Sequence, residues 1–112
     1  GFFTMMGVQP ERAVVELREA GADVTGANCG NGIDNMVEIA RLMRSATDGY
    51  LLVHSNAGIP AIRKGQIVYD ESPDYMADRF KDLADLGINI LGGCCGTTPS
   101  HISALSQIIH GE

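Results

Sequence analysis

Apolar residues along the chain follow two spacings, one typical of helices and one typical of buried strands. One stripe recurs at helical spacing and predicts an amphipathic helix; its members are Ile33, Met36, Val37, Ala40 and Met43. Short apolar runs at residues 50–53 and 88–91, and a partly β-branched run at 23–27, are instead typical of strands. The sequence therefore predicts three strands, with the amphipathic helix between the first two.

Proline and glycine mark the ends of three further predicted helices. The first opens at Pro10 and ends at 20–21, the second starts at Ser72-Pro73 and ends at Gly87, and the third starts at Thr98-Pro99. Their expected buried faces are Val14, Leu17 and Gly21; Met76, Phe80, Leu83 and Ala84; and Ile102, Leu105 and Ile109. Residues 62–69 are interpreted as a small hairpin or irregular excursion.

Helices alternate with strands along the whole chain, which indicates an α/β fold with a parallel sheet and right-handed crossovers. The chain of 112 residues is expected to form one domain. In such a sheet the three strand-to-helix loops, at 28–32, 54–58 and 92–96, meet at the C-terminal edge. Ligands bind at this edge in both open sheets and barrels.

Charge and hydropathy exclude some classes of function. The chain has 8 Lys and Arg against 14 Asp and Glu, a net charge of −6, and no basic cluster, so nucleic-acid binding is disfavoured. No apolar run is long enough to predict a membrane span. No signal peptide is visible, and we expect a cytoplasmic location.

Three cysteines lie in or beside two of the predicted loops: Cys29 after the first strand, and Cys94 and Cys95 after the third. Strands two apart in a sheet are separated by about 10 Å, so the thiols could converge on one ion. Three thiolate ligands suit Zn²⁺ and leave its fourth position open. The alternatives are inert buried cysteines, a disulfide between Cys94 and Cys95, and a redox pair without metal.

An all-thiolate zinc site favours one kind of chemistry. Coordination to zinc deprotonates a thiol that is mostly protonated at neutral pH. Three protein thiolates make the site net negative, so a fourth sulfur stays electron-rich and nucleophilic. The donor set therefore indicates activation of a thiol for attack on a methyl group, whereas zinc hydrolases more often use neutral histidine ligands.

Three segments carry a family resemblance. Residues 26–30 (GANCG), 56–60 (NAGIP) and 92–99 (GGCCGTTP) resemble, in this order, motifs of the homocysteine S-methyltransferase family. The resemblance implies that residues 1–112 are the C-terminal part of a TIM (β/α)8 barrel, with Cys29, Cys94 and Cys95 as zinc ligands. It implies methyl transfer to homocysteine, giving methionine. The donor would be betaine, a methylsulfonium compound, or methylcobalamin, with the cobalamin carried by another module.

The resemblance also draws attention to two polar residues as substrate-binding candidates. Asn28 lies beside a predicted ligand and either helps to order the site or serves as a turn residue. His54 lies near a strand end where related methionine synthases often place a glutamate that could hold the amino group of homocysteine. It is a substitute contact, a fourth zinc ligand or a hydrogen-bonded strand-end residue. His101 and His110 are predicted to lie on the surface.

A complete barrel of this type needs about 250 residues, so the resemblance implies that an N-terminal half-barrel is missing. The open edge and apolar inner face are expected to favour self-association. We expect the isolated chain to bind zinc but to turn over nothing. The alternative is a small zinc-binding or redox module without catalysis of its own.

Overall fold

The computed structural model describes residues 9–110 except 30 and 31, and gives only the backbone of Cys29. Four helices and five strands follow one another in the order α1 (Pro10–Glu19), β1 (Val24–Cys29), α2 (Ile33–Ala46), β2 (Tyr50–Ser55), β3 (Ala61–Arg63), β4 (Gln66–Val68), α3 (Pro73–Asp85), β5 (Ile90–Gly93) and α4 (Pro99–His110). The predicted alternation of helices and strands is confirmed. Within these described elements, no helix has the length and apolar character needed to cross a membrane.

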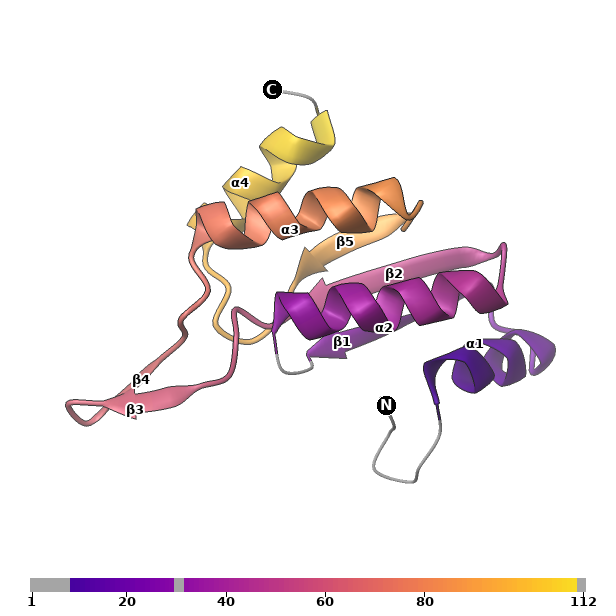
Figure 1. Ribbon diagram of the computed structural model, residues 1–112, viewed down its shortest axis with the longest axis horizontal. Helices are drawn as coiled ribbons and strands as arrows, with labels where there is room; N and C mark the ends of the chain where they lie inside the picture. Colours follow the sequence, from indigo (N-terminus) through magenta and orange to yellow (C-terminus); the bar gives the residue numbers. More distant parts are fainter. Residues whose placement is uncertain (1–8, 30–31, 111–112) are drawn as a thin grey trace.

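Three strands form a parallel sheet in the order β1-β2-β5. Helices α2 and α3 lie over one face of this sheet (Figure 1). The molecule measures 45 × 36 × 20 Å, and its shortest dimension equals about one helix layer on one sheet layer. Parallel strands with helices on a single face form a segment of barrel wall, as predicted for part of a TIM barrel.

The core lies between the sheet and these helices. Strand β2 points Leu51 and Val53 toward the helices, where both are fully buried. The predicted stripe of α2 is confirmed, since all five of its residues are buried. Phe80 and Leu83 of α3 complete the layer. Regular spacing therefore identified the buried face correctly where a helix packs directly on the sheet.

The opposite face of the sheet is largely uncovered. Val24, Tyr50 and Ile90 begin the three parallel strands, and they are 42%, 62% and 44% exposed. Tyr50 is paired in register with Val24, so the two side chains share this face. In a closed barrel this face would point inward.

Three helices depart from their predicted buried faces at single positions. Leu17 in α1 is 49% exposed, and in α3 Ala77 is buried whereas Ala84 is exposed. In α4 the expected face is right at Leu105 but wrong at Ile102 and Ile109, which are 46% and 49% exposed. The second buried residue of α4 is His101. Apolar spacing alone therefore does not fix every buried position of these helices.

Two of the predicted strands are longer than expected and one is shifted. Strand β1 continues through Cys29 and β2 through Ser55, because their parallel pairing continues to that point. Strand β5 begins at Ile90, since the Ile88 amide still donates to the Leu83 carbonyl and completes the end of α3 at 3.2 Å. Cys29 is thus the last residue of a strand, although it was predicted to lie in a loop.

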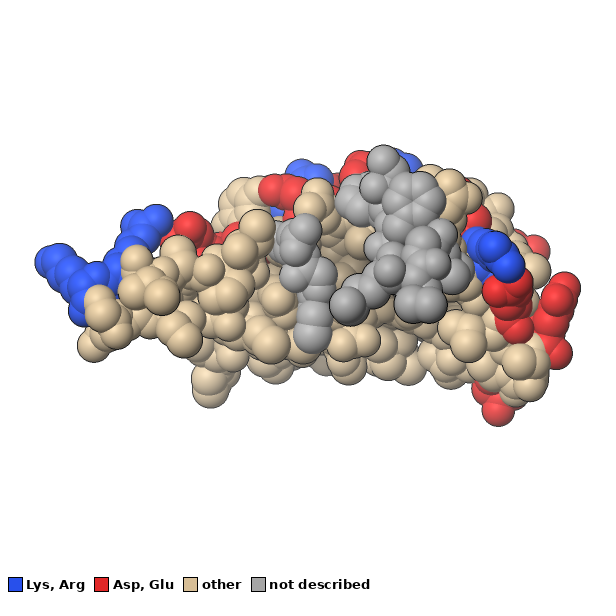
Figure 2. Space-filling model, turned by 90° about the horizontal axis from the view of Figure 1, so that it is seen from below, with Lys and Arg blue, Asp and Glu red and all other residues tan. Residues whose placement is uncertain are grey.

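The segment at 62–69 contains the predicted hairpin, formed by β3 and β4. Ile62 pairs with Ile67, and both are highly exposed. Figure 2 shows Lys and Arg side chains gathered at the end of the molecule where the hairpin lies. Arg63 pairs there with Asp70 at 3.3 Å. The hairpin extends away from the sheet, and its base lies beside the C-terminal edge (Figure 1).

Candidate metal centre

The backbone places the two cysteine-bearing segments at one edge of the sheet. The three strands end at Cys29 (β1), Ser55 (β2) and Gly93 (β5). Cys29 and Gly93 are both register partners of Ser55. Neighbouring strands lie 4.7–4.9 Å apart, so about 10 Å separates the backbone at Cys29 from the backbone at Gly93. The predicted juxtaposition of these loops is confirmed for the backbone, while the Cys29 side chain lies outside the described part of the chain.

Hydrogen bonds hold the second cysteine segment against the end of β2. The Cys94 amide donates to the Ser55 carbonyl at 2.8 Å, and the Cys95 amide donates to Asn56 Oδ1 at 3.0 Å. The Ala57 amide donates in return to the Cys95 carbonyl at 2.9 Å. These bonds continue the link between β2 and β5 beyond the last paired residues, so the position of the cysteine pair is tied to β2.

The adjacent cysteines lie in a turn. Both the amide and the hydroxyl of Thr97 donate to the Cys94 carbonyl, at 3.2 and 2.7 Å. Gly96 has a φ of +82°, and a Cβ atom there would lie 2.2 Å from the Tyr69 ring. The turn removes the alternation that would point neighbouring strand residues to opposite faces. No disulfide joins Cys94, which is partly buried, to Cys95, which is exposed.

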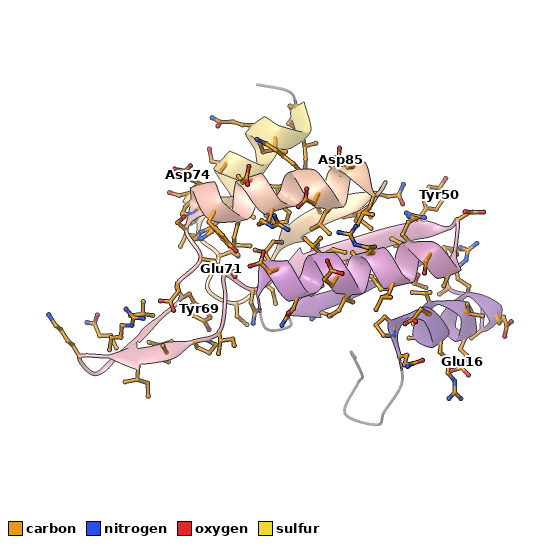
Figure 3. The ribbon with its side chains drawn as sticks, viewed as in Figure 1. Glu16, Tyr50, Tyr69, Glu71, Asp74 and Asp85 are labelled. Atoms are coloured by element: carbon orange, nitrogen blue, oxygen red, sulfur yellow. The ribbon has the colours of Figure 1, made fainter. Side chains whose placement is uncertain are left out.

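Glu71 is a site residue that the sequence did not reveal. Its Oε1 accepts the Ile33 amide at 2.9 Å, at the start of α2 and just after the loop that follows Cys29. Figure 3 shows Glu71 beside this end of α2. Burial raises the pKa of this carboxyl and the charge of Asp34 raises it further, while the Ile33 hydrogen bond lowers it. The contact spans 38 positions, so no local pattern could have predicted it.

His101 is buried, which corrects its predicted surface position. Its Nε2 lies 2.8 Å from the Glu71 carbonyl, which can only accept, so Nε2 carries a proton. Its Nδ1 accepts the Thr98 amide at 3.1 Å. The geometry therefore fits the neutral imidazole with its hydrogen on Nε2. His101 is buried because each ring nitrogen has a backbone partner, which a surface assignment from sequence could not anticipate.

Asn28 and His54 lie together on the uncovered face of the sheet. They are register partners on β1 and β2, and Gly92 continues the row on β5. The His54 ring covers Gly92, where a Cβ atom would lie 2.7 Å from His54 Cδ2. Asn28 is exposed and His54 is partly buried. The sheet thus brings the two predicted substrate-binding residues side by side, one position before the level of Cys29.

Among the side chains that the structure describes, no group of three His, Cys, Asp or Glu residues could hold a metal ion. That set excludes the thiol of Cys29. Cys94 and Cys95 lie in the turn after β5, and Cys29 ends β1, two strands away in the sheet. This placement is compatible with a three-thiolate donor set. The backbone placement and the donor chemistry therefore fit zinc, and the assignment of the ligands stays a prediction.

Comparison with known proteins gives two further findings. A family model described as "Homocysteine S-methyltransferase" matches residues 2–109. Crystal structures of the homocysteine methyltransferase MmuM from Escherichia coli are similar in fold. The metallated form gives a TM-score of 0.66 at 24% identity over 88% of this chain and 29% of that chain. The apo form gives 0.67 at 25% identity over 92% and 34%. The chain thus spans about a third of the length of these structures.

Proposed function

The chain belongs to the homocysteine S-methyltransferase family, and from this premise we propose that it forms the edge of a barrel that activates the homocysteine thiol for methyl transfer. Cys29, Cys94 and Cys95 are the proposed ligands of a Zn²⁺ ion, and methionine is the proposed product. The observation that carries the proposal is the strand register, in which Cys29 and Gly93 both pair with Ser55, from either side.

The chemistry follows from the donor set. Zinc held by three thiolates would keep the sulfur of homocysteine in its electron-rich thiolate form at neutral pH. The chain itself positions the metal ligands: the hydrogen bonds that the Cys94 and Cys95 amides donate to Ser55 and Asn56 hold the backbone of the cysteine pair before any ligand arrives. Such preorganisation lowers the cost of placing the acceptor sulfur.

Asn28 and His54 are the proposed contacts for the polar groups of homocysteine. Both lie on the face that would point into a closed barrel, beside the thiol edge. An amide and an imidazole can each hydrogen-bond a carboxylate or an amino group. A His54→Ala variant is therefore expected to bind zinc normally and homocysteine more weakly.

The uncovered face needs a partner, and we propose that it is covered by the remaining strands of the barrel. Two facts support this: the solved relatives are about three times longer than the matched region, and three large apolar side chains on this face are exposed. We expect the chain alone to bind zinc without turnover and to self-associate. A species that stays monomeric at every concentration in size-exclusion chromatography would contradict the self-association.

Zinc stoichiometry tests the metal site. We expect one zinc per chain after dialysis, and less than half an equivalent in Cys29→Ser, Cys94→Ser and Cys95→Ser variants. His110→Ala, which changes an exposed residue near the end of α4, is the matched control and should keep its zinc. Less than half an equivalent in the wild-type chain, unchanged by Cys95→Ser, would overturn the site.

Homocysteine itself separates the proposal from a zinc-binding or redox module without catalysis. In a cobalt-substituted chain completed by the remaining barrel strands, homocysteine should change the visible absorption and release protons, because a thiol joins the metal as a thiolate. A module without catalysis would bind the metal and show no response to homocysteine. Serine, which lacks the thiol, is the control ligand.

A further inference from the structure

A hydrogen-bond network centred on Glu71 connects the segments that follow all three parallel strands. We define the Glu71 network as Glu71 with its three backbone or ring partners, Ile33, Ala57 and His101. Glu71 lies in the segment between the hairpin and α3, outside every element that carries a cysteine. Three distinct groups of this one residue reach three different segments.

The carboxylate reaches the segment after Cys29. Glu71 Oε1 accepts the Ile33 amide at 2.9 Å, and a Cβ atom on Gly32 would lie only 2.7 Å from Oε2. Gly32 has a φ of +124°, a backbone conformation that favours glycine. The carboxylate thus holds the first amide of α2, and an anion at the N-terminus of a helix is favoured.

The backbone of Glu71 reaches the other two segments. Its amide donates to the Ala57 carbonyl at 3.1 Å, and the Ala57 amide donates to the Cys95 carbonyl at 2.9 Å. Its carbonyl accepts His101 Nε2 at 2.8 Å, in the helix that follows the cysteine pair. The position of Cys95 is therefore connected through Ala57 and Glu71 to the start of α2, three residues after the Cys29 loop begins.

We propose that Glu71 is a positioning residue that holds the start of α2, and with it the end of β1 at Cys29, at a set distance from the Cys94–Cys95 turn. His101 supports it by holding the Glu71 carbonyl. The inference rests on the proposed function, because its consequence is the affinity of the three thiols for one ion. Residues that orient metal ligands without touching the metal typically change affinity 10- to 100-fold when they are replaced.

The first test is zinc affinity, measured by competition with a chromophoric chelator. Glu71→Ala should weaken zinc binding at least tenfold. Glu71→Gln keeps an oxygen acceptor for the Ile33 amide and should restore affinity to within a few-fold of the wild-type value. Glu71→Asp keeps the charge but is shorter, so it should behave like Glu71→Ala. Equal affinity in all four proteins would overturn the proposal.

A control separates positioning from general stability. Arg44→Ala removes hydrogen bonds at the opposite edge of the sheet and should lower the melting temperature while leaving zinc affinity unchanged. If Glu71→Ala does not fold, Glu71→Asp and Glu71→Gln still decide the outcome. A loss of affinity in Arg44→Ala as large as in the Glu71 variants would reduce Glu71 to a structural role and overturn the inference.

A second test needs no metal, so it also decides the inference if the wild-type chain binds no zinc. In a Cys94→Ser background only Cys29 and Cys95 carry thiols, and a short bismaleimide should bridge them within one chain. The yield, read by mass spectrometry, should fall severalfold with Glu71→Ala and recover with Glu71→Gln. An unchanged yield would overturn the positioning role, whereas absent zinc with a changed yield would overturn only the proposed function.

Discussion

The two edges of the parallel sheet are held together by opposite kinds of side chain. At the edge where strands begin, Arg44 donates to the Gly49 carbonyl at 2.9 Å and to the Gly87 carbonyl at 2.8 Å. At the edge where strands end, Glu71 accepts the Ile33 amide. A guanidinium thus connects carbonyls at one edge, and a carboxylate accepts an amide at the other.

Alternation of strands and helices explains this difference. Helices of parallel α/β units end at the edge where strands begin, so unpaired carbonyls gather there and attract cations. Helices begin at the edge where strands end, so unpaired amides gather there and attract anions and anionic ligands. The three cysteines lie at or just beyond this second edge. We therefore assign stability to the Arg44 edge and ligand placement to the Glu71 edge.

The largest expected effect comes from shortening a side chain in the core that both edges share. Phe80 is fully buried between α3 and the rest of the core. Phe80→Ala should cost about 3–5 kcal/mol of unfolding free energy, because it leaves a cavity in the core. Urea denaturation followed by circular dichroism measures the loss. A cost below about 1 kcal/mol would mean that the two edges do not depend on a common core.

The next effect tests the Arg44 edge alone. Arg44 is partly buried, and its Nη2 also donates to Asn89 Oδ1 at 3.3 Å; the same oxygen accepts the Leu51 amide at 3.0 Å. Arg44→Ala should cost about 1.5–3 kcal/mol, the range for hydrogen bonds to a charged group. Denaturation gives the loss, and Arg41→Ala, on the exposed face of α2, is the control. Equal stability of the two variants would remove the assigned role of Arg44.

A smaller effect distinguishes the edges by function. Gly96→Ala and Gly65→Ala both place alanine at a positive φ, +82° and +77°, so each should lose about 1 kcal/mol of stability from backbone strain, and Gly96→Ala more because its Cβ would overlap the Tyr69 ring. Only Gly96 has the Tyr69 ring against it, whereas nothing lies within 4 Å of a Cβ on Gly65. Zinc competition should show weaker binding for Gly96→Ala alone. Equal zinc affinity in the two variants would contradict the importance of the turn.

The smallest effect concerns pH at the Glu71 edge. Burial raises the folded-state pKa of Glu71 above its ordinary value of 4.5. Between the ordinary and the raised pKa, Glu71 binds more protons in the folded chain than in the unfolded chain. Its contribution to the free energy of unfolding therefore falls as pH rises through this interval. The melting temperature of wild type minus that of Glu71→Gln should therefore be larger at pH 4 than at pH 7. A difference that grows with pH would contradict the assigned direction.

The fold was largely predictable because each element has a regular signal. The stripe of α2 and the Ser72-Pro73 start of α3 are local patterns, and Ser72 does accept the Tyr75 amide at 3.2 Å. The edge shared by the cysteine loops followed from the alternation of strands and helices. The buried face of α4 followed only at Leu105, because a polar residue, His101, is the other buried residue of that helix.

The candidate site was predictable only in part. Cysteine spacing and glycine-rich motifs identified the thiol segments, whereas Glu71 and His101 depend on contacts 38 and 30 positions apart in the chain. Such contacts follow from the packing of whole elements and leave no periodic signal in the sequence. The residues proposed to hold the thiols in place were therefore visible only in the three-dimensional structure.

The most direct test of the central claim is X-ray absorption at the zinc edge of the zinc-loaded chain. Three cysteine ligands predict three sulfur atoms at about 2.3 Å. The Cys29→Ser variant should show fewer sulfurs, because one of the three ligands is lost, and His54→Ala should match the wild-type spectrum. A first shell dominated by nitrogen and oxygen, or a sulfur count unchanged by Cys29→Ser, would contradict the proposed zinc centre.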